Sequence, residues 1–336
     1  MRKDNNFDFL RFLFAVFVVL SHAYPLSGTD ETQQWIYKMT NGQIVLAQIG
    51  LSGFFVISGF FIFQSMERSK SLLQYYKKRM LRLFPALLVL LLITMVVVPF
   101  VYTGVGSVFS NSTYLSYLPN NISLFGFQGV IDGVFDTNHY KAINGSLWTI
   151  RYEFTLYIVI SFLFFIRTNQ KLLVVLLALV FILFSVLYLF FMGRFSGSSI
   201  LGMQGYHILN LGNFFIVGSL LASLNFVKYK SNSILFGLIF IIVLALYFNF
   251  FNAIKHVVFS MFIIVLGYTP IKGIKDFGKL GDASYGIYIY SFFIQQLLMW
   301  FFKLNTINLA VYSLLLSIMF GYLSWFLVEK RVLKFK

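Results

Sequence analysis

Long apolar runs separated by short polar stretches dominate the chain. A helix that crosses a membrane needs about 20 mostly apolar residues. Ten segments meet this requirement: 8–26, 43–63, 84–102, 147–166, 172–191, 207–225, 233–250, 254–270, 283–302 and 308–327. Most of the connections between them are short. The pattern therefore predicts an all-α, polytopic transmembrane helical bundle that forms a single domain over residues 1–336.

The exception among the connections is the stretch over residues 103–146, which is rich in Gly, Ser, Asn and Thr. It shows no evident secondary structure, and loops of this length are usually functional or disordered. Because loops carry specificity on a rigid scaffold, we expect this segment to select the substrate.

Composition supports the membrane class and excludes several others. Hydrophobic residues make up 59% of the chain and charged residues 11%, whereas soluble domains are about half apolar and about a quarter charged. This balance excludes a soluble, disordered or nucleic-acid-binding protein. With no cysteine, disulfide scaffolds and thiolate chemistry are also excluded. Four scattered histidines and 11 carboxylates show no metal-ligand spacing, so we expect no metal site.

The positive charges are distributed unevenly among the connections. If the N-terminus lies inside and the chain crosses ten times, 19 of the 26 Lys and Arg residues fall on inner segments and six on outer ones. Inner segments of membrane proteins are enriched in these two residues. The distribution predicts cytoplasmic N- and C-termini in a multi-pass protein of the cell (plasma or inner) membrane.

Two ionisable residues, Arg11 and His22, lie in the first predicted span. Eleven residues make about three helical turns, which places both side chains on one helix face about 16 Å apart. Intramembrane ionisable residues are functional candidates because they are costly to bury. The alternative is that Arg11 extends to the inner interface and His22 caps the outer end of the helix.

Arg79 and Arg82 form a closely spaced pair in the inner segment YYKKRMLRLFP. Three residues apart on a helix, they are neighbours that can grip one anion together. The planar guanidinium suits phosphate because it can form two parallel hydrogen bonds. The alternative is a basic cluster that binds anionic lipid and fixes the topology.

Glu153 lies about one turn into the fourth predicted span, within NGSLWTIRYEF. This span starts outside, where the first span ends, so we expect Glu153 and His22 to lie at similar depth. A carboxylate beside an imidazole stabilises the imidazolium, which suits a general base. The alternative is an interfacial pair of Arg151 and Glu153.

These motifs together resemble acyltransferase family 3, the polytopic membrane O-acyltransferases of cell-surface glycans. The resemblance covers essentially the whole chain and rests on five motifs in order: Arg11 and His22 in FDFLRFLFAVFVVLSHAYP, the second-span segment GLSGFFVISGFF, Arg79 and Arg82 in KKRMLRLFP, Trp148 and Glu153 in SLWTIRYEF, and LGDASYGIYIYSFF with the terminal VEKR. Ser291 stands where many members have His, so no second catalytic imidazole is expected there.

The resemblance implies transfer of an acyl group, most often acetyl, from cytoplasmic acyl-CoA to a hydroxyl of an extracytoplasmic glycan. The acceptor would be a surface polysaccharide, a lipopolysaccharide or a lipid-linked saccharide. Arg79 and Arg82 would hold the phosphates of acetyl-CoA, and His22 would act as general base or acyl carrier, with Arg11 and Glu153 as its catalytic partners. Trp148, Tyr285 and Ser291 are weaker candidates for substrate contact, and interfacial anchoring is an alternative role for Trp148.

A transporter of a lipid-linked glycan or a small anion is the competing class, because it could use the same intramembrane charges as a pathway. Ten spans and a basic inner face fit either class. A transferase should act on acetyl-CoA in detergent, whereas a transporter needs a sealed compartment.

Overall fold

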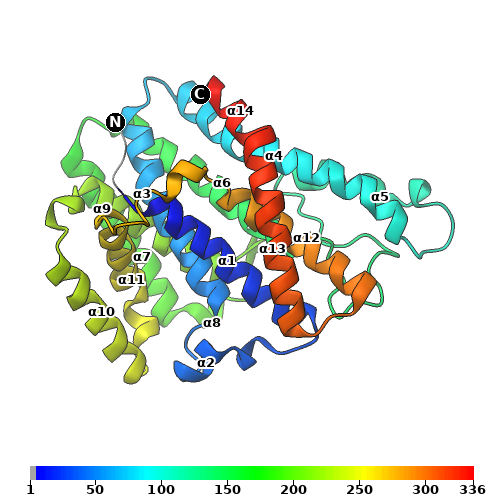
Figure 1. The fold of residues 1–336 in the computed structure, drawn as a ribbon. Coiled ribbons are helices and arrows are strands. Elements are labelled where there is room, and N and C mark those ends of the chain that lie inside the picture. The colour runs from blue at the N-terminus through cyan, green and yellow to red at the C-terminus, as the bar shows by residue number, and fades with distance from the viewer. Residues whose placement is uncertain (1–4) are drawn as a thin grey trace.

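The computed structural model describes residues 5–336, which are mostly helical (Figure 1). Arg2 and Lys3, counted above among the inner charges, lie outside the described residues. Strands β1 (Ser199–Ile200) and β2 (Met203–Gln204) pair antiparallel. The helices are α1 (Phe7–Leu26), α2 (Trp35–Met39), α3 (Leu46–Arg68), α4 (Leu72–Val101), α5 (Ser112–Ile122), α6 (Trp148–Ser161), α7 (Gln170–Phe190), α8 (Met192–Phe195), α9 (Gly205–Ser223), α10 (Asn232–Tyr247), α11 (Phe251–Tyr268), α12 (Ser284–Phe302), α13 (Thr306–Ser324) and α14 (Lys330–Val332).

A helix forms in each of the ten segments that the sequence predicts to span the membrane. Within residues 5–336, eight helical segments are long and apolar enough to cross a bilayer. The other two predicted spans are α10, a shorter apolar helix, and α12, whose residues are mostly buried. Because α12 packs inside the bundle, it does not need to be apolar on every side. The all-helical, multi-pass class is thus confirmed.

Close backbone contact holds the centre of the bundle together, where α3 packs against α1 and α9. A Cβ atom built on Gly59 would lie 2.0 Å from the carbonyl oxygen of Phe215, and one on Gly218 would lie 2.3 Å from that of Val56. Ser219 Oγ donates to the carbonyl oxygen of Gly59 at 3.0 Å. Gly59 of GLSGFFVISGFF therefore serves helix packing, the role that small residues usually have in membrane bundles.

Gly59→Ala should lower the thermal stability of the purified protein, because the added methyl group meets backbone that cannot rotate away. Overpacking of this kind costs about 1–3 kcal/mol. Gly237→Ala on α10 is the matched control, since a Cβ atom there would meet nothing within 4 Å. Thermal unfolding monitored by intrinsic fluorescence should show a lower midpoint temperature for Gly59→Ala than for Gly237→Ala. Equal midpoint temperatures would contradict this account of the α3–α9 contact.

The start of α1 and the end of α13 lie at the same end of the bundle, as an even number of crossings requires. Arg11, one turn into α1, lies 3.4 Å from Asp282, and Arg82 joins Asp282 to Glu329, which follows α13. Ion pairs thus tie both parts of the chain to Arg82, in the first half of α4.

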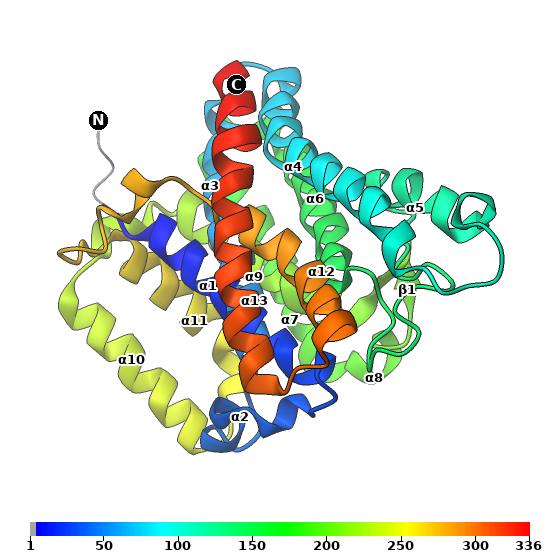
Figure 2. The same ribbon diagram turned by 45° about the vertical axis from the view of Figure 1, so that its right-hand side comes forward.

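The connection over residues 103–146 contains α5, so the expectation that it lacks regular structure is wrong. Asn111 begins this helix, because its side chain accepts hydrogen bonds from the backbone N–H groups of Thr113 and Tyr114. Figure 2 shows α5 projecting from one side of the bundle and α10 lying at the opposite edge.

Candidate active site

A cavity of about 360 Å³ lies between α1, α3, α4, α6 and α12. Its wall combines aromatic and aliphatic side chains with a group of charged ones. The charged residues are Arg11, Arg79, Arg82, Glu153, Asp282 and Lys336. The helix faces that the sequence singled out therefore meet at one end of the bundle, but His22 lies farther along α1 and does not line the cavity.

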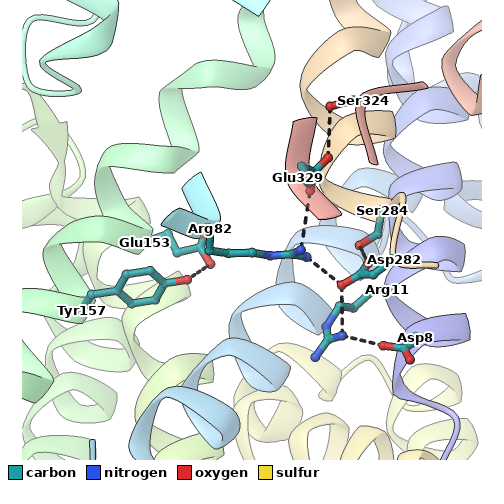
Figure 3. A network of polar contacts seen from close by, with 9 residues as sticks. All are labelled: Asp8, Arg11, Arg82, Glu153, Tyr157, Asp282, Ser284, Ser324 and Glu329. Carbon is teal, nitrogen blue, oxygen red and sulfur yellow. Dashed lines mark hydrogen bonds and ion pairs between the residues drawn. The ribbon is translucent and has the colours of Figure 1, made fainter. Parts of the chain in front are cut away.

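Arg82 is held by two carboxylates inside the protein (Figure 3). Its guanidinium lies 2.7 Å from Asp282 Oδ2 and 3.5 Å from Glu329 Oε2. The side chain of Glu329 is 2% exposed, and a π-helical turn over Trp325–Glu329 brings it toward Arg82. Such turns are rare in proteins, and those that occur are often at functional sites. The charge of Arg82 is thus already neutralised within the protein.

Asp282 connects Arg82 with Arg11, which lies 3.4 Å away and also pairs with Asp8 at 2.8 Å. Ser284 Oγ donates to the other carboxylate oxygen of Asp282 at 2.5 Å. Burial by itself would raise the pKa of Asp282, but the charges of Arg82 and Arg11 and the hydrogen bonds from Ser284 outweigh it and lower this pKa to about 2. Arg11 is therefore part of an ion-pair network.

Arg79 has different surroundings from Arg82. Its guanidinium lies 5.9 Å from the ring centres of Tyr75 and Tyr157, and Nη2 donates to Ser65 Oγ at 3.4 Å. Its Nε is buried without a hydrogen-bond partner. Within residues 5–336, no carboxylate lies within 4.0 Å of this guanidinium. Arg79 is the member of the arginine pair that remains available to an anion.

Glu153 lies in the same cavity as Arg79. Its Oε1 accepts hydrogen bonds from Ser58 Oγ at 3.1 Å and from the hydroxyl group of Tyr157, one turn along α6. The ring of Tyr157 thus lies beside Arg79, while its hydroxyl group bonds to Glu153.

His22 lies away from the cavity, near the other end of α1. Its Nδ1 is buried without a hydrogen-bond partner, and its ring contacts Phe292 at 5.4 Å between centroids. The expected pairing of His22 with Glu153 is absent from the described residues. The helix containing Glu153 begins with the turn at Gly145, so Glu153 lies about 12 Å into that segment. Glu153 therefore lies deeper than the sequence analysis placed it, and its partners come from α3 and α6.

The weaker candidates are separated in the structure. Tyr285 lines the cavity, and its hydroxyl group donates to the carbonyl oxygen of Leu83 at 3.0 Å. Ser291 is buried and donates to the carbonyl oxygen of Tyr288. Trp148 packs against His207 at 4.3 Å between ring centroids and does not line the cavity.

Sequence reasoning missed Asp282, Glu329, Ser58 and Tyr157 as site residues. A signal existed for the first two, because an acidic residue beside an apolar segment needs a cationic partner. Ser58 and Tyr157 gave no such signal, since uncharged hydroxyl groups are common in membrane helices.

The fold and the cavity define a helical, multi-pass membrane protein with a charged site at one end of its bundle. The family model for the acyltransferase domain of acyltransferase family 3 matches residues 4–329, and the chain belongs to this family. This membership confirms the resemblance seen in the sequence and favours membrane acyl transfer over transport.

Two relatives are similar to this chain in sequence. An O-acetyl transferase of Shigella phage Sf6 is 30% identical over 349 residues, which cover 99% of this chain and 97% of that protein. Nodulation protein 10 of Rhizobium leguminosarum bv. viciae is 30% identical over 190 residues, which cover 50% of this chain and 46% of that protein. No solved structure matches the chain.

Proposed function

We propose that this protein transfers an acetyl group from acetyl-CoA to a hydroxyl group of a glycan on the opposite side of the membrane. The acceptor is a surface polysaccharide, a lipopolysaccharide or a lipid-linked saccharide. The observation that carries the donor assignment is Arg79, a cation without a carboxylate partner in a cavity between helices. Coenzyme A has three phosphate groups, and a guanidinium is a strong partner for phosphate.

Lys336 adds a further positive charge to the wall of the cavity, beside Arg11, Arg79 and Arg82. The pKa of Lys336 is lowered to about 8, mainly by partial burial and secondly by repulsion from Arg82 and Arg79. Repulsion of this kind means that the potential near Arg79 is positive, which favours a phosphate group there.

We assign the end of the bundle that carries Arg79 to the cytoplasm, where acyl-CoA is found. Ten spans with both termini inside support this orientation through the distribution of Lys and Arg. The protein would then be a multi-pass protein of the plasma or inner membrane, with His22 toward the outer face.

In this proposal His22 acts on the acceptor. One ring nitrogen takes the proton of the glycan hydroxyl group, the hydroxyl oxygen attacks the thioester carbonyl carbon, and the C–S bond breaks to release the thiol of coenzyme A after protonation. In an alternative route, the neutral imidazole nitrogen attacks the thioester carbonyl carbon, the C–S bond breaks, and the thiolate of coenzyme A takes the proton of the other ring nitrogen. The hydroxyl oxygen then attacks the acyl carbon, the C–N bond breaks, and the hydroxyl proton returns to the ring. In both routes Arg11 fixes the cavity wall through Asp282.

The path from the cavity to His22 passes Phe292. Tyr288 lines the cavity, Phe292 lies one helical turn farther along α12, and its ring contacts His22. In this proposal the reacting thioester reaches His22 past this aromatic side chain. Glu153 is a positioning residue in this arrangement, because it holds the hydroxyl groups of Ser58 and Tyr157 beside Arg79.

Acetyl transfer should be measurable with the purified protein in detergent. Mixed with acetyl-CoA and glycan from the cells that produce it, the protein should release free thiol at a rate that depends on the acceptor. Mass spectrometry of the glycan should show the added acetyl groups. A folded preparation that consumes acetyl-CoA only in sealed vesicles, without acetylating glycan, would contradict the proposal and favour transport.

A further inference from the structure

A second cavity, of about 270 Å³, lies between α3, α9, α10 and α11. It shares no lining residue with the cavity around Arg79. Apolar side chains form most of its wall, among them Ile49 of α3, Phe214 of α9, Ile242 of α10 and Phe259 of α11. Figure 2 shows α10 at the edge of the bundle. The proposed acyl-transfer mechanism uses none of these residues.

The cavity opens beside α10 toward the surroundings of the bundle. Ile239 and Val243 line it and are 40% and 56% exposed. Phe236 and Phe240 on the same helix are exposed by 68% and 63%. An apolar surface of this kind faces hydrocarbon in a membrane protein. The cavity is therefore accessible to lipid chains.

Lys255 is the charged residue among those that line this cavity. Its ammonium group donates to Asn252 Oδ1 at 3.0 Å and lies 5.2 Å from the ring centre of Tyr188. Within residues 5–336, no carboxylate lies within 4.0 Å of this ammonium. The residue lies about 6 Å from the start of α11, a depth at which a lysine side chain can reach the interface.

Gln43 and Asn210, two other polar residues in the wall, already have partners. Gln43 donates to the carbonyl oxygens of Thr40 and Leu246, and Asn210 Oδ1 lies 3.0 Å from His256 Nε2. A ligand for this site must therefore combine a hydrocarbon chain for the apolar wall with a negative charge for Lys255.

We propose that this cavity binds one acyl chain of an anionic glycerophospholipid, with the lipid phosphate at Lys255. The bilayer supplies this chemistry at the opening beside α10. Ion pairing between Lys255 and the headgroup gives preference for anionic over zwitterionic lipid, while the apolar wall holds the chain. The bound lipid fills the gap between α10 and the rest of the bundle.

Native mass spectrometry of the delipidated full-length protein tests the headgroup preference. Phosphatidylglycerol and phosphatidylcholine with identical chains are added in equal amounts. The unmodified protein should retain one phosphatidylglycerol with about tenfold preference, the effect of one charge-assisted contact, and Lys255→Met should abolish that preference. Lys303→Met is the matched control, because Lys303 is exposed in the connection between α12 and α13. Equal preference for phosphatidylglycerol in Lys255→Met and Lys303→Met would overturn the proposal.

A cavity-filling variant tests the acyl-chain site separately. Val243→Trp should reduce retention of both phospholipids, whereas Phe240→Trp on the exposed side of α10 should not. Unchanged retention in a folded Val243→Trp protein would show that the chain binds elsewhere. If Val243→Trp does not fold, the comparison of Lys255→Met with Lys303→Met still decides the proposal. Displacement of phosphatidylglycerol by an equal amount of polyprenyl phosphate would assign the cavity to a lipid carrier and overturn it.

Discussion

Arg79→Ala should weaken binding of coenzyme A by about 10- to 150-fold, whereas Arg82→Ala should mainly destabilise the fold. Loss of one charge-assisted phosphate contact costs about 1.5–3 kcal/mol. Arg79 has no carboxylate partner among the described residues, so its removal leaves no buried charge unpaired. Removal of Arg82 leaves Glu329 and Asp282 without their nearest cation. Breaking a buried ion pair costs about 3–5 kcal/mol, and Arg11 should keep the loss near the lower limit.

Calorimetric titration with coenzyme A and thermal unfolding in detergent measure these two effects independently. Lys77→Ala is the matched control, because Lys77 is exposed on the same helix and does not line the cavity. Arg79→Lys should recover only part of the affinity, since an ammonium cannot form two parallel bonds with phosphate. Affinity that is equal in Arg79→Ala and Lys77→Ala would remove Arg79 from the donor site.

His22→Gln should reduce acetyl transfer by about 10²- to 10⁴-fold while coenzyme A binding and thermal stability stay close to those of the unmodified protein. Glutamine keeps a hydrogen-bonding group but cannot take a proton at neutral pH, and general-base catalysis is worth about this factor. The fold should tolerate the change because His22 Nδ1 makes no hydrogen bond that would be lost. Acetylation of glycan by the purified variant measures the effect.

His139→Gln controls for the loss of a histidine, because His139 is exposed in the connection before α6. It should retain the transfer rate of the unmodified protein at saturating acceptor, because a residue in the segment over 103–146 can change acceptor affinity without taking the proton. A folded His22→Gln protein with more than about a tenth of that rate would rule out His22 as the proton acceptor. The proton would then have to pass to another group, and Glu153, which lines the cavity, would be the first to examine.

The difference between Arg79 and Arg82 could not be predicted from their spacing. Spacing shows that two side chains share a helix face, but it does not show what lies opposite them. Asp282 and Glu329 are 200 and 247 residues away from Arg82 along the chain, and only the packing of α4 against α12 and the end of α13 brings them together. The sequence therefore predicted that the two arginines share a helix face, but not that Arg82 is paired with carboxylates while Arg79 is not.

The position of Glu153 along its helix was also difficult to predict from the sequence. Counting residues from the predicted start of a span places a side chain to within about a turn, because the boundary itself is uncertain by a few residues. The helical segment starts at Gly145, two residues before the predicted boundary, and Glu153 lies in the cavity containing Arg79. Hydroxyl groups on two helices, those of Ser58 and Tyr157, then fix its position.

The sequence by itself determined the helical membrane class, the locations of the helices in the ten apolar segments and the family, because each follows from local composition and from motifs within single segments. Apolar length decides whether a segment can span a bilayer, and small residues indicate where helices can approach closely. Tertiary structure alone decided that Arg82 is neutralised while Arg79 is not, and that His22 lies outside the cavity. These facts depend on which helix faces meet, and the energy of a charge within a protein is set by partners that are distant in the chain.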